Sequence, residues 1–252
     1  MRGTCSLVAG IVIVTASVSA RAQTAPLDTV TEVVRQKARI DVKADYEAAR
    51  RQHMQWHKTH NDPWEWDVFE IMTGPDTGGY IIASGNHQWR DMEEWNARNA
   101  AADGADSLAQ MGFAITSSER SYWTQLNSIS RLPPQGERLP LATVTYYRTR
   151  PGSDRAVRAA IGRVNAALDA GNYPLSTIWY VLASGGEGPT FALLTPRTGL
   201  GDMAPAPGLL EVLATQLGRA RAEALMASFF ENVTSTSSEM LRRRPDLSYV
   251  PN

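Results

Sequence analysis

The chain contains the segment NDPWEWDVFEIMTG at residues 61–74 and the segment NYPLSTIWYVLASG at residues 172–185, an offset of 111 residues. Each segment opens with an Asn-x-Pro turn, continues as a run rich in strand-forming residues and ends at a glycine. The same offset relates Ala48-Ala49 to Ala159-Ala160 and Asp91-Met92 to Asp202-Met203. The repeated order of turn and strand signals predicts two copies of one structural unit.

Both copies are expected to have the same elements in the same order. The first is predicted to consist of a strand at 32–40, a helix at 43–58, a hairpin of strands 66–73 and 79–84, helical segments at 89–102 and 107–113, and a strand at 115–126. The second is predicted to consist of a strand at 141–149, a helix at 154–169, a hairpin of strands 177–184 and 190–195, a helical region at 209–231 and a strand near 235–241. This β-α-β-β-α-β order is that of a ferredoxin-like unit.

A proline-rich joint at residues 131–140 separates the two copies, because proline removes a backbone donor and restricts its neighbour. We therefore expect a first ferredoxin-like repeat at 23–133 and a second at 134–252. Each unit would cover one face of its sheet with helices and leave the other face without a cover. An exposed apolar sheet face is unstable in water, so the two copies are expected to cover each other within one chain.

In this layout the chain resembles the dimeric α+β barrel superfamily in its single-chain tandem form. The order of elements and the repeat length are most similar to those of NIPSNAP-like and antibiotic-biosynthesis-monooxygenase-like members. The resemblance implies an α+β fold in which two tandem βαββαβ units form an intrachain barrel. The superfamily includes cofactor-free oxygenases of aromatic substrates, isomerases, haem-handling enzymes and proteins without known catalysis, so the fold does not select a function.

The N-terminal residues 1–22 have the pattern of a cleaved signal peptide. Arg2 precedes an apolar run from Leu7 to Val18, and Ala20-Arg21-Ala22 fits the small-x-small cleavage rule. Export predicts a periplasmic or secreted protein. The only cysteine, Cys5, lies within this segment, so the mature chain is expected to have no disulfide and no thiolate metal site.

Charge composition excludes two classes of partner. The chain has 25 basic and 26 acidic side chains, so it has no net field to attract nucleic acid or an anionic membrane surface. No segment after the signal peptide is long and apolar enough to act as a membrane anchor. A soluble globular protein is expected, with a homo-oligomer compatible with the sequence.

The two copies differ at positions that should face the core. In the second helix Ile161, Val164 and Leu168 form an apolar stripe, and 111 residues earlier the same positions are Arg50, His53 and His57. In the first hairpin Asp67 and Glu70 similarly replace Ile178 and Val181. Because a buried charge without a partner costs several kcal/mol, these residues should pair or line a polar cavity. The sequence predicts a site in the first half, with the matching space in the second half filled by aliphatic side chains.

Two functions fit these residues. As an oxygenase-like or isomerase-like enzyme, the protein would use His53 or His57 as a general base and Arg50 to stabilise an oxyanion or enolate, with Glu70 as the fourth catalytic candidate. The expected ligand is a small hydrophobic or aromatic molecule, and the candidate ligand-binding residues are Tyr46, Trp56, Trp66 and Asp67. The alternative is a non-catalytic ligand-binding or assembly module of the same fold.

Structural roles compete with each of these assignments. His53 is equally well explained as a core histidine bonded to a carbonyl, Glu70 as the ion-pair partner of Arg50, and the tryptophans as core packing. His53 and His57 with Glu70 could form a two-histidine, one-carboxylate metal set, but His-x-x-x-His is common by chance. Haem on either histidine is a further option, although in haem-binding tandem relatives the ligand histidine lies in the second copy, which here has none. The residues therefore assign neither a metal nor a cofactor.

Overall fold

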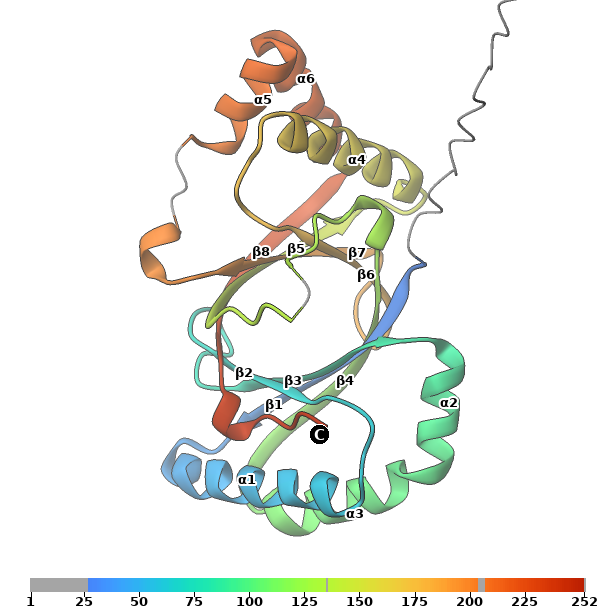
Figure 1. The fold of residues 1–252 in the computed structure, drawn as a ribbon, viewed down its shortest axis with the longest axis vertical. Helices are drawn as coiled ribbons and strands as arrows, with labels where there is room; N and C mark the ends of the chain where they lie inside the picture. The colour runs from blue at the N-terminus through green and yellow to red at the C-terminus, as the bar shows by residue number, and fades with distance from the viewer. Residues whose placement is uncertain (1–26, 135, 204–206, 252) are drawn as a thin grey trace, which may run out of the picture.

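The computed structural model describes residues 27–134, 136–203 and 207–251. Their eight strands form one closed antiparallel barrel in the order β1-β3-β2-β8-β5-β7-β6-β4, and the helices lie outside it (Figure 1). The expected signal peptide lies outside the described residues. Within the described residues, no helix has both the length and the apolar character needed to span a membrane.

The first half contributes four adjacent strands of the barrel. They are β1 (Thr29–Ala38), β2 (Asp67–Ile71), β3 (Tyr80–His87) and β4 (Ile115–Gln125). Its helices are α1 (Lys43–Thr59), α2 (Trp89–Arg98) and α3 (Ala100–Met111). Helices α1 and α3 pack side by side on the outer face of these strands (Figure 1).

The second half repeats this arrangement. Its strands are β5 (Leu141–Thr149), β6 (Ile178–Ser184), β7 (Thr190–Arg197) and β8 (Val233–Arg243). Its helices are α4 (Asp154–Ala170), α5 (Leu209–Leu217) and α6 (Arg219–Phe230). The halves join through the antiparallel pairs β2–β8 and β4–β6, which close the barrel.

Backbone conformation also recurs at the 111-residue offset. Asn61 and Asn172 both have a positive φ, 51° and 49°, which lies in the left-handed region. Each residue lies in the turn between a helix and the strand that follows it. Gly74 and Gly185 are likewise in that region at φ 96° and 86°. A Cβ at Gly185 would lie 2.3 Å from the carbonyl oxygen of Arg120, so only glycine fits this hairpin turn.

The order of elements predicted from the sequence is confirmed, and most boundaries agree within three residues. One prediction in the first half is wrong. The residues around Gly104 were expected to separate two helical segments, but α3 runs through them, and the break lies at Asn99 between α2 and α3. Glycine costs only about 1 kcal/mol in a helix interior, which tertiary packing of the helix outweighs.

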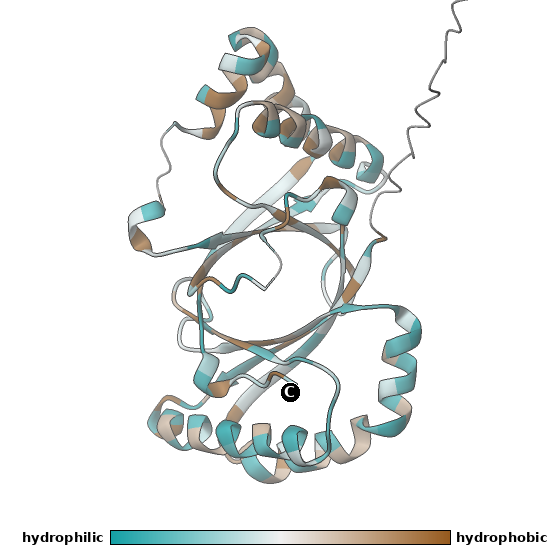
Figure 2. Ribbon diagram, in the orientation of Figure 1, coloured by the Kyte–Doolittle hydropathy of each residue, from teal (hydrophilic) through white to brown (hydrophobic). Residues whose placement is uncertain are grey.

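Three layers of core follow from this architecture. Inside the barrel, side chains from both halves pack together, among them Ile71, Ile81, Val144 and Leu241. One apolar cluster lies under α1 and α3, and others lie under α4, α5 and α6. The more apolar character of α5 than of α1 is visible in Figure 2.

The C-terminal segment crosses from the second half to the first. After β8, the 3₁₀ turn Pro245–Leu247 places Leu247, which is fully buried, in the core cluster under α1. Two residues later Tyr249 exchanges backbone hydrogen bonds of 2.9 Å with Trp66. The first half is therefore completed by residues from the very end of the chain (Figure 1).

Candidate functional site

The polar stripe of α1 faces the sheet, as the comparison of the two copies predicts. Arg50, His53 and His57 are each no more than 3% exposed. They lie at the helical positions occupied in α4 by the buried Ile161 and Leu168 and the partly buried Val164. The charged and aromatic groups are thus held between a helix and a sheet, where each needs a polar partner.

The two imidazoles converge on one carboxylate. Nε2 of His53 lies 3.3 Å and Nε2 of His57 lies 3.4 Å from Oδ1 of Asp103, which comes from α3. The ring centroids of the two histidines are 4.8 Å apart. The opposite ring nitrogens are occupied, since Nδ1 of His53 lies 2.7 Å from Asp106 and Nδ1 of His57 lies 2.7 Å from Asp62.

Asp62 organises the inner wall of this cluster. Its carboxylate accepts hydrogen bonds from the indoles of Trp66 and Trp95 and from the backbone N–H of Trp64, besides its contact with His57. Burial alone would raise the pKa of Asp62, but these hydrogen bonds outweigh it and hold that pKa below its ordinary value. Asp62 is therefore an ionised, fully bonded anchor for the His57 ring.

A polar chamber of about 50 Å³ lies between α1, α3 and the sheet. Its lining includes Glu32, Arg50, His53, His57 and Asp103. A cavity needs on the order of 10–15 Å³ of such volume for each water, so this one accommodates a few small atoms rather than an aromatic ring. The chamber suits a small polar group.

Two charged groups in the chamber lack full compensation. Arg50 donates to Oε1 of Gln36 and to the hydroxyl of Tyr46, but its Nε has no hydrogen-bond partner within the described chain. Neither carboxylate oxygen of Glu32 has one either, although Nε of Arg120 approaches Oε1 at 3.2 Å. Burial raises the pKa of Glu32, with Arg120 opposing the shift and Asp103 adding to it. Glu32 is therefore harder to ionise than a glutamate in water.

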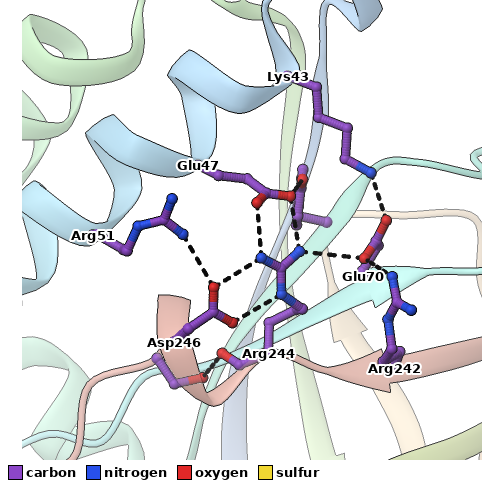
Figure 3. Close-up of polar contacts among 9 residues, drawn as sticks. Lys43, Glu47, Arg51, Glu70, Arg242, Arg244 and Asp246 are labelled. Atoms are coloured by element: carbon purple, nitrogen blue, oxygen red, sulfur yellow. Dashed lines mark hydrogen bonds and ion pairs between the residues drawn. The ribbon is translucent and has the colours of Figure 1, made fainter.

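Glu70, the fourth catalytic candidate, does not line this chamber, and neither the alternative pair with Arg50 nor the alternative metal set containing Glu70 is formed. Its carboxylate is bound by Lys43, Arg242 and Arg244 (Figure 3). Arg244 also forms a two-pronged pair with Glu47 at 2.8 Å. This network ties the C-terminal segment to α1 and β2, and Lys43, Arg242 and Arg244 hold Glu70 away from the histidines.

Of the four expected ligand-binding residues, only Trp66 lines the chamber. Asp67 lies on the same face of β2 as Phe69, whose partners are inside the barrel, and it pairs with Arg243. Tyr46 is fully buried behind the chamber and donates to Gln36 at 2.8 Å. Trp56 is half-buried and stacks on His60, with ring centroids 4.2 Å apart.

The second half contains a larger cavity, so the prediction that this space is filled is wrong. About 230 Å³ lies open between α4, α6 and the sheet, lined mainly by apolar side chains such as Val164, Leu168, Trp179 and Phe229. Aliphatic residues predict an apolar layer, but not a filled one, because filling requires complementary shapes. Rigid aromatic rings and short aliphatic side chains share this layer and leave space between them.

Sequence reasoning missed the partners of the histidines. Asp103 and Asp106 lie one turn apart on α3, a spacing that places both on one helix face. Recognising α3 as continuous through Gly104 would have revealed this acidic face. Glu32 gave no comparable local signal, since a single glutamate in a strand is usually a solvated side chain.

The fold is shared with proteins of known structure. A "putative monooxygenase" of Lactobacillus acidophilus superposes with a TM-score of 0.56 at 6% identity, covering 90% of this chain and 98% of that one. An anthrone oxidase-like protein has a TM-score of 0.53 at 15% identity, with coverage of 86% and 91%. A mutant chlorite dismutase of Candidatus Nitrospira defluvii has a TM-score of 0.56 at 8% identity, with coverage of 86% and 92%.

These neighbours are proteins of the dimeric α+β barrel superfamily. At such low identities the similarity shows the fold alone. No protein-family model matches the chain, and no curated protein matches it in sequence.

Proposed function

We propose that the protein is an oxygenase-like enzyme acting on a small molecule, with the polar chamber of the first half as its reaction centre. The observation that carries this proposal is the convergence of His53, His57 and Asp103 on a buried chamber whose counterpart in the other half is apolar. Burying charged groups in such a place costs free energy. A layer that served packing alone would avoid this cost with apolar side chains, so the charged groups support a functional role.

The chamber residues have complementary chemical roles in this proposal. The Nε2 atoms of His53 and His57 are the basic groups of the chamber. They accept a proton directly, or they bind another group that takes part in the reaction. The guanidinium of Arg50 stabilises negative charge that develops on an oxygen of the substrate. Glu32, whose pKa is raised by burial, is the proton donor in this proposal. Because the chamber is small, only the reactive group of the substrate enters it.

Oxygen uptake tests this proposal, with anthrone and hydroquinone as the probe substrates because one structural neighbour is named anthrone oxidase-like. Wild-type protein should consume oxygen with at least one probe, and Arg50→Gln should reduce kcat about 100-fold. His60→Ala is the matched control, since His60 is exposed on the same helix and should leave the rate unchanged. No uptake by the wild type with either probe would refute oxygenase-like chemistry.

A second candidate function is non-catalytic binding of an apolar acid in the second-half cavity. Within the described chain, Nε of Arg197 and Oγ1 of Thr177 lack hydrogen-bond partners, and both residues line this otherwise apolar space. An aromatic or aliphatic carboxylate would bury its apolar body there and pair its charge with Arg197. Fluorescence titration with anilinonaphthalene sulfonate should show binding that Val164→Phe abolishes by filling the cavity. Equal binding by both proteins would contradict it.

We also propose that the protein is exported, on the strength of the N-terminal pattern. Mass spectrometry of protein expressed with its full N-terminus in a bacterial host would show a mature chain beginning at Gln23. A chain that retains Met1 through Ala22 would contradict export.

The duplication of one ancestral unit is a further part of the proposal. The matching element order and the recurring left-handed asparagine and glycine residues support it. We further propose a relationship to NIPSNAP-like and antibiotic-biosynthesis-monooxygenase-like proteins, which the tandem layout of the chain resembles.

A further inference from the structure

We infer that the chamber binds one divalent first-row transition-metal ion through Nε2 of His53, Nε2 of His57 and Oδ1 of Asp103. The inference rests on the proposed function only in locating the reaction centre in this chamber. It assigns the two imidazoles the role of ligands, and it stands or fails on metal binding alone.

Both nitrogen-to-oxygen separations among the three atoms match those of a coordination shell. All lie within 4.8 Å of one another, and the two nitrogen-to-oxygen separations are 3.3 and 3.4 Å. An ion about 2.0–2.2 Å from each ligand, as zinc is in proteins, requires ligand-to-ligand separations of about 3.0–3.6 Å. The two histidines lie on α1 and the aspartate lies on α3, and these two helices pack side by side.

The second ring nitrogens are arranged as metal-binding histidines require. Nδ1 of His53 is bonded to Asp106 and Nδ1 of His57 to Asp62, each at 2.7 Å. A carboxylate on Nδ1 fixes the ring orientation, makes the imidazole more basic and leaves the Nε2 lone pair directed at the ion. Asp62 is itself held by the indoles of Trp66 and Trp95, so the His57 ring has a rigid support.

The charge of the cluster calls for a divalent cation. The carboxylates of Asp62, Asp103, Asp106 and Glu32 surround this position with the guanidiniums of Arg50 and Arg120, so the carboxylates outnumber the guanidiniums by two. Oδ1 of Asp103, which faces both nitrogens, has no hydrogen-bond partner within the described chain. One ion between the three atoms satisfies the oxygen and both lone pairs at once.

The ligand types select the class of ion. Two imidazole nitrogens with one carboxylate oxygen suit zinc, iron, cobalt or nickel, whereas magnesium and calcium prefer shells of oxygen atoms. Three protein ligands would leave at least one coordination position free, and Arg50 and Glu32 line the same chamber. An open position is the feature that distinguishes catalytic from structural metal sites.

Cobalt(II) titration of chelator-treated full-length mature protein is the decisive experiment, read by visible absorption and by isothermal titration calorimetry. The wild type should bind one equivalent and develop d–d bands of a nitrogen- and oxygen-ligated ion. His57→Ala and Asp103→Asn should each weaken binding at least 10- to 100-fold. His60→Ala, which removes an exposed histidine of the same helix, should bind as the wild type does.

Failure of the wild type to bind a stoichiometric ion would overturn the inference, as would equal weakening by His60→Ala. Circular dichroism of each variant separates lost ligands from lost fold, and His57→Gln replaces His57→Ala if the latter is unfolded. The measurement needs no substrate. A protein that binds cobalt but consumes no oxygen would refute the oxygenase proposal alone, and one that consumes oxygen without binding a metal would refute only this inference.

Discussion

Glu47 shows how a single residue of the first half depends on the end of the chain. Its carboxylate accepts two hydrogen bonds of 2.8 Å from Arg244 and one of 2.6 Å from Tyr80, with Lys43 adding to the positive field. The bonds from Arg244 are the main reason that the pKa of Glu47 falls to about 2. Bidentate contacts of this kind are stronger than ordinary surface ion pairs.

This shift predicts a specific acid sensitivity. The pKa of Glu47 is lower in the folded chain than the ordinary 4.5, so its contribution to stability is complete above pH 4.5 and is lost as the pH falls toward 2. In Glu47→Gln, the free energy of unfolding should be lower at pH 7 and should decline less steeply between pH 4.5 and 2. Urea denaturation across this range measures both effects.

Glu94→Gln provides the control for the Glu47 variant. Glu94 is half exposed, and among the described residues its ion-pair partners are Arg90 and Arg98, one turn away on either side in α2, so its removal should leave the pH profile of stability unchanged. Identical profiles for Glu47→Gln and the wild type would show that the Arg244 contact is not formed in solution.

At the scale of elements, α1 and α4 solve the same packing problem with different chemistry. Helix α4 presents an apolar stripe, whereas α1 presents His53 and His57 to carboxylates on α3 and on the loop after α1, and Arg50 to Gln36 and Tyr46. If α1 were made apolar, Asp62, Asp103 and Asp106 would lose their contacts with the imidazoles. The polar character of α1 is therefore tied to that of its surroundings.

The double change His53→Val and His57→Leu, which copies α4 into α1, tests this dependence. It should lower the free energy of unfolding by about 3 kcal/mol or more, because Asp103 and Asp106 lose their contacts with the imidazoles and the buried Asp62 loses its bond to His57. Thermal and urea denaturation measure the effect, and His60→Leu on the exposed side should stay within about 0.5 kcal/mol of the wild type. An equally or more stable double variant would mean that these contacts are dispensable.

At the scale of the whole molecule, the C-terminal segment completes the hydrophobic core of the first half. Leu247 is fully buried in the core under α1, and Tyr249 stacks on His57 with ring centroids 5.5 Å apart. A chain ending at Arg244 should lose about 3 kcal/mol or more of unfolding free energy, by analogy with the loss of a buried leucine.

The control for this truncation is a chain that ends at Tyr249, which keeps both contacts and should unfold as the full-length protein does. Urea denaturation of the two truncated chains and of the full chain measures the difference. Equal stability of all three would show that the segment contributes nothing to the core.

Closure of the barrel makes a second prediction at this scale. Each half alone would expose the inner face of its sheet, since the interior cluster draws on both halves and β2–β8 and β4–β6 join them. Chains cut within the joint at residues 131–140 should remain associated, and separately expressed halves should self-associate or aggregate. Sedimentation velocity distinguishes these outcomes, and two stable, independent monomers would refute the single-barrel description.

Local signals account for what could be predicted from the sequence. The Asn-x-Pro turns, the glycines and the change between strand and helix periodicity mark most elements within a few residues, because these signals act over a few neighbours. Comparison of the two copies also identified Arg50, His53 and His57 as inward-facing, since a helix places residues three and four apart on one face.

Only the tertiary structure decided which groups those residues meet. Asp103 comes to the histidines from another helix, and Tyr249 from the C-terminal segment, while Glu70 is held away from them by Lys43, Arg242 and Arg244. The sequence by itself also determined that the layer under α4 is apolar, but not that it contains a cavity. The pattern of residues along a helix or strand predicts the polarity of its faces. The contact partners of a side chain and the volume of a cavity depend on long-range packing, which no local sequence signal encodes.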